Sequence, residues 1–480
     1  MSCLHPTGFP RLFQLAQHDL DLDAYFTAVE QTAASAYLKA TALIDVVRAL
    51  SIFGIRFAEL TPSALLQYSW EARSNGLVVY HRGDRSSFAA KLAWVVLVEM
   101  GHFPAGTPPT IRAAGQRGQL TVTELVDQYP ISNQLVRQLL IDYVTRRALA
   151  LDYSTLRNMA RMIAGLFWYK IEQLAPGIED LHIPTHVYDR WLVAIRLRQD
   201  GRERLSVDPI LLAVRSMYLD LHTWSASEPE RWAHWVAPCP IRPGEFAEAG
   251  KRERRRLERT HQRTRARQPL LPILVAHVAG RLAHLRQLLA TAAAAEPGQQ
   301  ITVDARVYER TWTGYDQQHR ADDPVRVRDT TGEIINVRLA EDNAFWDWAL
   351  TEVLRLSGAR IEEALELTQL SIRKYLRPNG EAIGLLVIAP SKTERERVIP
   401  MSAELFAVIA AIIRRHHDTV GTIPVLPRYD SNEKVHTDPM PFLFQRKLRQ
   451  ARAVIGQHQA VDMLRQRCQD LAVTHPEFGQ

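Results

Sequence analysis

The chain has 480 residues, of which 46% are hydrophobic and 23% charged, a composition that is ordinary for a soluble protein of about three globular domains. The longest apolar runs, at 92–98 and 405–413, fall well short of the ~18 residues that a membrane-spanning helix needs. The formal net charge of +6 weakly favours polyanionic partners. We therefore expect a globular protein without a membrane span.

The first residues and the cysteines indicate the compartment. Prolines and an arginine within the first eleven residues interrupt any apolar core of a secretory signal. Only three cysteines occur, and they are widely spaced, which argues against a disulfide framework and against a cysteine-based zinc site. A reducing cytoplasm is the expected location.

Residues 1–115 are predicted to form a helical domain. Apolar residues recur at helical spacing in 37–50 and 89–98, and Thr61 precedes Pro62 as an N-cap precedes a first-turn proline. The proline- and glycine-rich stretch at 103–109 is typical of an exit loop, so a second domain is expected to follow.

Residues 116–295 are predicted to form a second helical region. Helices are expected at 156–174 and 186–197 from the spacing of apolar residues. A similar order of glycine, acidic, proline and aromatic residues recurs at 54–70 and 177–191, which raises the hypothesis of an internal duplication.

A basic arm at 251–267 concentrates positive charge in a short stretch of this region. Its nine basic and two acidic residues give a local net charge of +7, which exceeds the +6 of the whole chain. Such a run can be a solvated helix face, or it can contact DNA phosphates without reading sequence and with a steep salt dependence. The basic residues are Lys251, Arg252, Arg254, Arg255, Arg256, Arg259, Arg263, Arg265 and Arg267.

After a small-residue linker at 291–299, the pattern changes from helical to mixed. Residues 326–328 and 334–338 are predicted to form a hairpin, and 341–356 the helix that leads to Arg360. Residues 383–389 and 398–400 have strand composition, and the turn between them carries Lys392.

Two motifs in this part of the chain carry candidate chemistry. The first spans 357–367 and reads SGARIEEALEL, in which Arg360 and Glu363 are three residues apart and are expected on one helix face. The second is Ser-Lys-Thr at 391–393, followed by Val-Ile-Pro. Alone, the first could be a solvated ion pair and the second an ordinary polar turn; their order and spacing together favour a functional site.

In these two motifs the sequence resembles the catalytic domain of the tyrosine site-specific recombinases, the phage-integrase-like family. The family reads small-Gly-x-Arg-x-x-Glu-x-x-x-Leu on its first catalytic helix and Ser-Lys-Thr on a following hairpin. The resemblance implies cleavage and rejoining of DNA by a tyrosine, through a 3′-phosphotyrosyl bond and a free 5′-hydroxyl.

The resemblance also implies a role for each residue. Arg360 would hold the non-bridging phosphate oxygens, because a guanidinium is always ionised and forms two parallel hydrogen bonds. Glu363 would brace that arginine, and Lys392 would protonate the leaving 5′-oxygen as general acid. The family's chemistry needs no metal or nucleotide cofactor, and none is expected.

The rest of the family's catalytic set is not found in the sequence. No histidine after Lys392 has an arginine three residues later, and no tyrosine follows where the nucleophile is expected. Tyr429 lies in a proline-rich loop before that point, so it is not expected to be the nucleophile. The sequence is interpreted either as a fragment cut within the catalytic domain or as a natural protein without the chemistry.

We therefore expect a mainly α, multidomain protein with helical DNA-binding domains at 1–115 and 116–295. An incomplete α+β catalytic domain with a β-hairpin and small sheet would follow at 296–480. The expected partners are double-stranded DNA and further copies of the chain, as a tetramer on DNA, in a nucleoid-associated cytoplasmic location without a membrane. Two alternatives stay open: an accessory protein that binds recombination sites without cutting, and a helical scaffold whose binding ignores salt and DNA.

Overall fold

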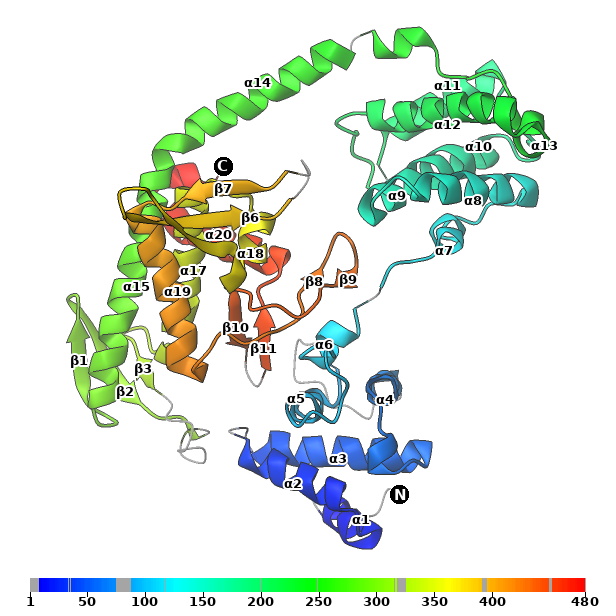
Figure 1. Ribbon diagram of the computed structural model, residues 1–480. Helices are drawn as coiled ribbons and strands as arrows, with labels where there is room; N and C mark the ends of the chain where they lie inside the picture. Colours follow the sequence, from blue (N-terminus) through cyan, green and yellow to red (C-terminus); the bar gives the residue numbers. More distant parts are fainter. Residues whose placement is uncertain are drawn as a thin grey trace. The chain divides into compact units, whose positions relative to one another are not determined.

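The chain is mainly helical, as predicted, with small antiparallel sheets (Figure 1). The computed structural model describes residues 8–32, 34, 36–74, 88–116, 118–198, 200–247, 249–314, 316, 325–390, 395–448 and 451–479. These residues divide into two compact units, one of Met1–Gln116, Pro269–Ser431 and His436–Gln480 and the other of Arg117–Gln268 and Asn432–Val435. The first unit contains two separate hydrophobic cores and the second unit contains one.

The N-terminal part of the first unit is helical. Its α-helices are α1 (Phe9–Gln17), α2 (Leu20–Gln31), α3 (Ala36–Phe53), α4 (Pro62–Ser74), α5 (Lys91–Glu99) and α6 (Ile111–Ala114). Asp45 of α3 is buried and accepts hydrogen bonds from the Tyr68 hydroxyl and the Ala90 backbone N–H, both at 2.8 Å. This carboxyl group therefore ties α3 to α4 and to the start of α5.

The second unit is also helical. Its elements are α7 (Val122–Asp127), α8 (Gln134–Ala148), α9 (Tyr153–Ala160), a π-helical segment (Arg161–Trp168), α10 (Tyr169–Leu174), α11 (Thr185–Arg196), α12 (Asp208–Ser227), α13 (Pro229–Trp232) and α14 (Ala249–Arg267). The helix predicted at 156–174 is confirmed, since α9, the π segment and α10 follow one another without a break. Fully buried aromatic rings, among them Phe167, Trp168 and Trp191, form the centre of this unit.

The C-terminal part of the first unit combines helices with small sheets. Its helices are α15 (Leu271–Ala294), α17 (Val337–Ser357), α18 (Ile361–Glu366), α19 (Ala403–Val420) and α20 (Gln457–Ala472). The sheets are β1 (Gln300–Val303), β2 (Arg306–Thr311), β3 (Arg326–Arg328) and β4 (Ile334–Asn336); β5 (Ile372–Leu376), β6 (Ala382–Ile388) and β7 (Arg397–Pro400); β8 (Tyr429–Asp430) and β9 (Val435–His436); β10 (Gln445–Leu448) and β11 (Ala451–Val454).

Two predicted boundaries in this part are wrong. The hairpin of β3 and β4 exists, but its second strand ends at Asn336, whose side chain caps α17 by accepting from the Leu339 N–H at 3.1 Å. The predicted linker at 291–299 begins too early, because the alanine-rich stretch extends α15 to Ala294. The helix predicted at 341–356 is confirmed within α17.

Helices α15, α17 and α19 pack side by side over the core of this part (Figure 1). Ionic groups are buried along α17. Arg415 of α19 donates to both carboxylate oxygens of Glu341 at 2.8 and 2.6 Å, and Arg467 of α20 lies 3.2 Å from Asp347. These pairs fix the neighbours of α17, whose C-terminus leads directly into Arg360.

Candidate functional site

Arg360 lies at the junction of α17 and α18. Helix α17 ends at Ser357, and Gly358 follows with a φ of 63°, a left-handed conformation that favours glycine. Arg360 is extended and is the N-cap of α18. The prediction that Arg360 and Glu363 lie on one helix face is therefore wrong. The reason is local, because the Glu363 carboxylate accepts from the Arg360 backbone N–H at 2.8 Å and so starts the helix there.

Glu363 holds two arginine side chains. Its own side chain is 1% exposed, and it accepts from Arg360 Nη1 at 2.8 Å. The guanidinium of Arg397, on β7, also contacts this carboxylate. The side chain of Arg360 is 51% exposed and that of Arg397 is 42% exposed. Each guanidinium group therefore binds the buried carboxylate on one side and remains accessible to solvent on the other. Such an arrangement suits contact with an anion on the outside.

The strands on either side of the second motif reach the first motif. Strands β6 and β7 are antiparallel, and their last paired residues before the turn are Ile388 and Arg397. The contact between Arg397 and Glu363 therefore brings the base of this turn to Arg360. The predicted general acid Lys392 lies outside the described residues, as do Ser391 and Thr393.

A further arginine approaches α18 from β8 and its neighbours. Arg428 is buried, and its Nη2 donates to Glu366 at 2.6 Å and lies 3.5 Å from Asp430. Burial raises the pKa of Glu366, and the charge of Arg428 opposes that rise. The ring of Tyr429 is half-buried, with its centroid 5.1 Å from that of His436. This segment is thus fixed to the helix that begins at Arg360.

Sequence reasoning missed both Arg397 and Arg428. Arg397 is part of the Val-Ile-Pro strand and carries no signal beyond its position five residues after Lys392. Arg428 lies 62 residues from Glu366, and nothing in the local sequence connects the two.

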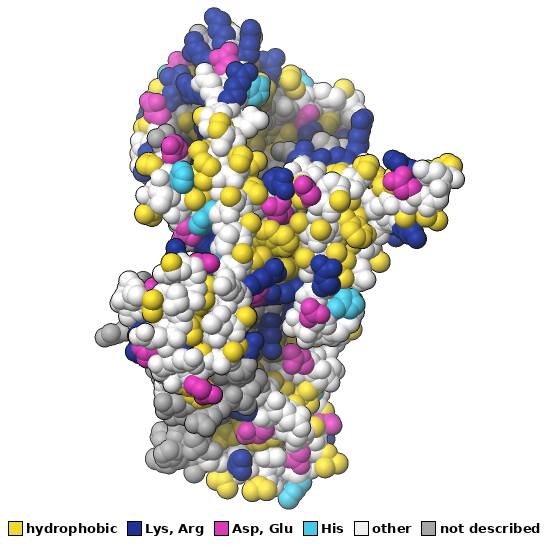
Figure 2. All heavy atoms as spheres, turned by 90° about the vertical axis from the view of Figure 1, so that its left-hand side faces the viewer, with side chains coloured by type: hydrophobic (Ala, Val, Ile, Leu, Met, Phe, Trp, Pro, Cys, Tyr) yellow, Lys and Arg dark blue, Asp and Glu magenta, His cyan; other side chains and the backbone are white. Residues whose placement is uncertain are grey.

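The basic arm forms the exposed helix α14 (Ala249–Arg267), which contains every basic residue of 251–267. Figure 2 shows Lys and Arg side chains crowded at the top of the view, at the height of this helix in Figure 1. Arg252 donates to Asp208 at 2.7 Å, and Arg256 donates to Glu253 at 2.7 Å. A helix with this charge can lie along a polyanion.

Among the described residues, no helix is long and apolar enough to cross a membrane. Within the same ranges, no group of three or more His, Cys, Asp or Glu side chains is placed to hold a metal ion. The chain matches no protein-family model, no curated protein and no solved structure.

Proposed function

We propose that this chain binds double-stranded DNA and takes part in site-specific recombination of the tyrosine recombinase type, with Arg360 on the scissile phosphate. One observation carries the proposal. Two solvent-accessible guanidinium groups, Arg360 and Arg397, meet on the buried carboxylate of Glu363, and Arg397 follows Lys392 by five residues in the sequence.

The chemistry of phosphoryl transfer explains why this arrangement suits the reaction. Negative charge builds on the non-bridging oxygens during attack, and fixed guanidinium groups stabilise it without reorganising. Glu363 offsets part of the desolvation of both arginines, and its buried position limits where they can point. Arg360 is assigned to the scissile phosphate, and Arg397 to the same or the neighbouring phosphate.

In the proposed reaction, a tyrosine hydroxyl gives up its proton to solvent and attacks the phosphorus, and the bond to the 5′-oxygen breaks. The leaving 5′-oxygen takes a proton from Lys392, which yields a free 5′-hydroxyl and a 3′-phosphotyrosyl bond. No tyrosine of this sequence is assigned as the nucleophile. Helix α14 is assigned to sequence-independent phosphate contacts, and assembly as a tetramer on DNA in the cytoplasm belongs to the same proposal.

A second function is favoured by one specific observation, the absence of a His-x-x-Arg motif after Lys392 in these 480 residues. A protein with Arg360 and Glu363 but without the second arginine motif can bind recombination sites without cutting them. This accessory role shares the DNA contacts of the first function and differs from it only in the chemical step.

The test uses duplexes enriched from random DNA by binding to the full-length protein. A covalent protein–DNA adduct on a denaturing gel, with a tyrosine on the 3′-phosphate, is the expected result if the protein supplies the nucleophile that is not assigned within these 480 residues, and Arg360→Ala should abolish the adduct. An adduct that persists in Arg360→Ala would remove Arg360 from the site. Tight binding without any adduct would select the accessory function, and binding that ignores salt and DNA would refute both.

A further inference from the structure

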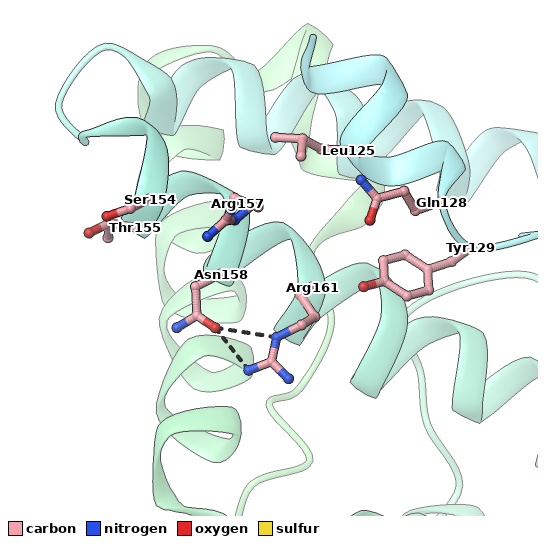
Figure 3. Close-up of a pocket in the computed structure, with 8 residues that line it drawn as sticks. All are labelled: Leu125, Gln128, Tyr129, Ser154, Thr155, Arg157, Asn158 and Arg161. Carbon is pink, nitrogen blue, oxygen red and sulfur yellow. Dashed lines mark hydrogen bonds between the residues drawn. The ribbon is translucent and has the colours of Figure 1, made fainter. Parts of the chain in front are cut away.

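We propose that a crevice between α7 and α9 binds a phosphodiester group of the DNA backbone through Arg157 and Arg161. The inference rests on the proposed DNA binding, but the crevice lies in the second unit and shares no residue with the Arg360 site. It has a volume of about 530 Å³. Figure 3 shows Leu125, Gln128 and Tyr129 along one side and the residues of the α9 helix along the other.

One helical face supplies the polar groups of the crevice. Ser154, Arg157, Asn158 and Arg161 are spaced at i, i+3, i+4 and i+7, so they lie on the same side of the helix. The residues on the opposite side are buried, so the helix presents this face in a fixed orientation. The buried residues are Tyr153, Leu156, Met159 and Ala160.

Among the residues that the structure describes, the arginines of this face lack an acidic partner. Within the described part of the chain, no carboxylate pairs with Arg157 or Arg161. Arg161 instead donates to the Asn158 side-chain oxygen at 2.9 and 3.3 Å, and the Arg157 guanidinium lies 5.9 Å from the centroid of the Tyr153 ring. These contacts orient the guanidinium groups but leave their charge uncompensated.

A third arginine increases the local excess of positive charge. Burial lowers the pKa of Arg204, and the nearby cations Arg161 and Arg198 lower it further. Its Nε is buried and has no hydrogen-bond partner among the described residues. Like charges held this close repel one another, and a bound anion would relieve that repulsion.

The wall opposite the arginines is preformed. A Cβ atom at Gly165 would lie 2.3 Å from Cε1 of Tyr129, so the tyrosine ring fits only against a residue without a side chain. Tyr129 is thereby held at the edge of the crevice, opposite Arg161 (Figure 3). The hydroxyl group of Tyr129 and the amide groups of Gln128 and Asn158 add donors of the kind that contact DNA phosphates and sugars.

The surroundings favour a polymer over a single small phosphate. The same compact unit carries α14, whose nine basic residues can lie along an extended polyanion. A free nucleotide or inorganic phosphate has the same anionic group but would leave α14 without a role. We therefore assign the crevice to a backbone phosphate of duplex DNA.

The experiment measures binding of the full-length protein to a mixed-sequence 30-base-pair duplex at a series of salt concentrations. Arg157→Gln with Arg161→Gln should lower the slope of log affinity against log salt by about two, because two phosphate contacts are lost. The matched control is Arg137→Gln on α8, which removes the same charge from the same unit. Arg137 is already neutralised by Asp127 at 2.6 and 2.7 Å, so its slope change should be much smaller.

Gly165→Ala provides a second variant that changes no charge. The alanine must displace Tyr129, and we expect weaker binding with the fold retained in circular dichroism. A double variant with the wild-type slope would overturn the crevice while leaving the proposed function intact, whereas a wild-type protein that does not bind the duplex would overturn both. A third outcome is that the double variant loses binding of a deoxynucleotide or inorganic phosphate at constant ionic strength and keeps its duplex binding. That result would assign the crevice to a small phosphate and so overturn the proposal.

Discussion

The guanidinium of Arg397, on β7, contacts the carboxylate of Glu363, on α18. This contact joins two segments that are 34 residues apart in the sequence, and it brings the start of β7 to the carboxylate that also binds Arg360. The carboxylate is buried while both of its arginines are half-exposed. The buried Glu363 therefore fixes two guanidinium groups that solvent can reach. The relationship gives the first of four predictions.

Glu363→Gln should destabilise the protein by about 1–3 kcal/mol, because two guanidinium groups lose the negative charge of the carboxylate that they share. This expected destabilisation is smaller than that for a fully buried ion pair, because water partly screens both arginines. Urea unfolding measures the change. The control is Glu381→Gln, which breaks the exposed pair of Arg377 and Glu381 and should cost less than about 0.5 kcal/mol. Equal losses for the two variants would contradict the bracing role of Glu363.

The local part of this site could be predicted from the sequence. The helix before Arg360, the β6–β7 hairpin and the pairing of Arg360 with Glu363 follow from spacing and composition. The N-cap conformation of Arg360 could not be predicted, because Gly358 and the Glu363 capping interaction compete with a continuous helix.

The long-range part could not be predicted at all. The contacts of Arg397 with Glu363 and of Arg428 with Glu366 join separate elements, and hydrophobic periodicity carries no information on which charged residues meet across the fold. The mainly helical class followed from periodicity because most helices here have one buried apolar face. The placement of Lys392 stays a prediction, as do the domain boundaries.

The Asp45 carboxyl group should make the stability of the N-terminal helices depend on pH. Burial raises its pKa from 3.8 to about 6, although hydrogen bonds from Tyr68 and Ala90 oppose the rise. The folded state therefore holds this proton more tightly than the unfolded state, and stability is lost as pH rises from about 4 to about 6. The loss is on the order of 3 kcal/mol.

Asp45→Asn should remove most of this dependence, because the amide stays neutral and can still accept from the Ala90 N–H. Thermal unfolding of both proteins between pH 4 and 7 measures the difference. The exposed carboxylate Asp21 is the control, and Asp21→Asn should keep the wild-type profile. A profile of Asp45→Asn that still falls over this range would show that another group titrates there.

Two glycine substitutions should have opposite effects. Gly358 has a φ of 63° and open space around its Cα, so Gly358→Ala should cost about 1 kcal/mol through backbone strain alone. Gly280 lies inside α15 with open space where a Cβ would stand, so Gly280→Ala should add about 0.5–1 kcal/mol of stability. Chemical unfolding of the two variants under identical conditions measures both changes, and a shared sign would contradict the conformational argument.

Helix α14 should set much of the salt dependence of DNA binding. Replacing Arg254, Arg255, Arg259 and Arg263 with glutamine should lower the slope of log affinity against log salt by about one for each arginine that contacts a phosphate. Arg256 is the internal control, because Glu253 already neutralises it at 2.7 Å, and Arg256→Gln alone should change the slope least. We expect equal helix content in all variants, because glutamine and arginine have similar helix propensities. Circular dichroism checks this. A fourfold variant with the wild-type slope would mean that α14 does not lie on the DNA, and its charge would then belong to a solvated helix face.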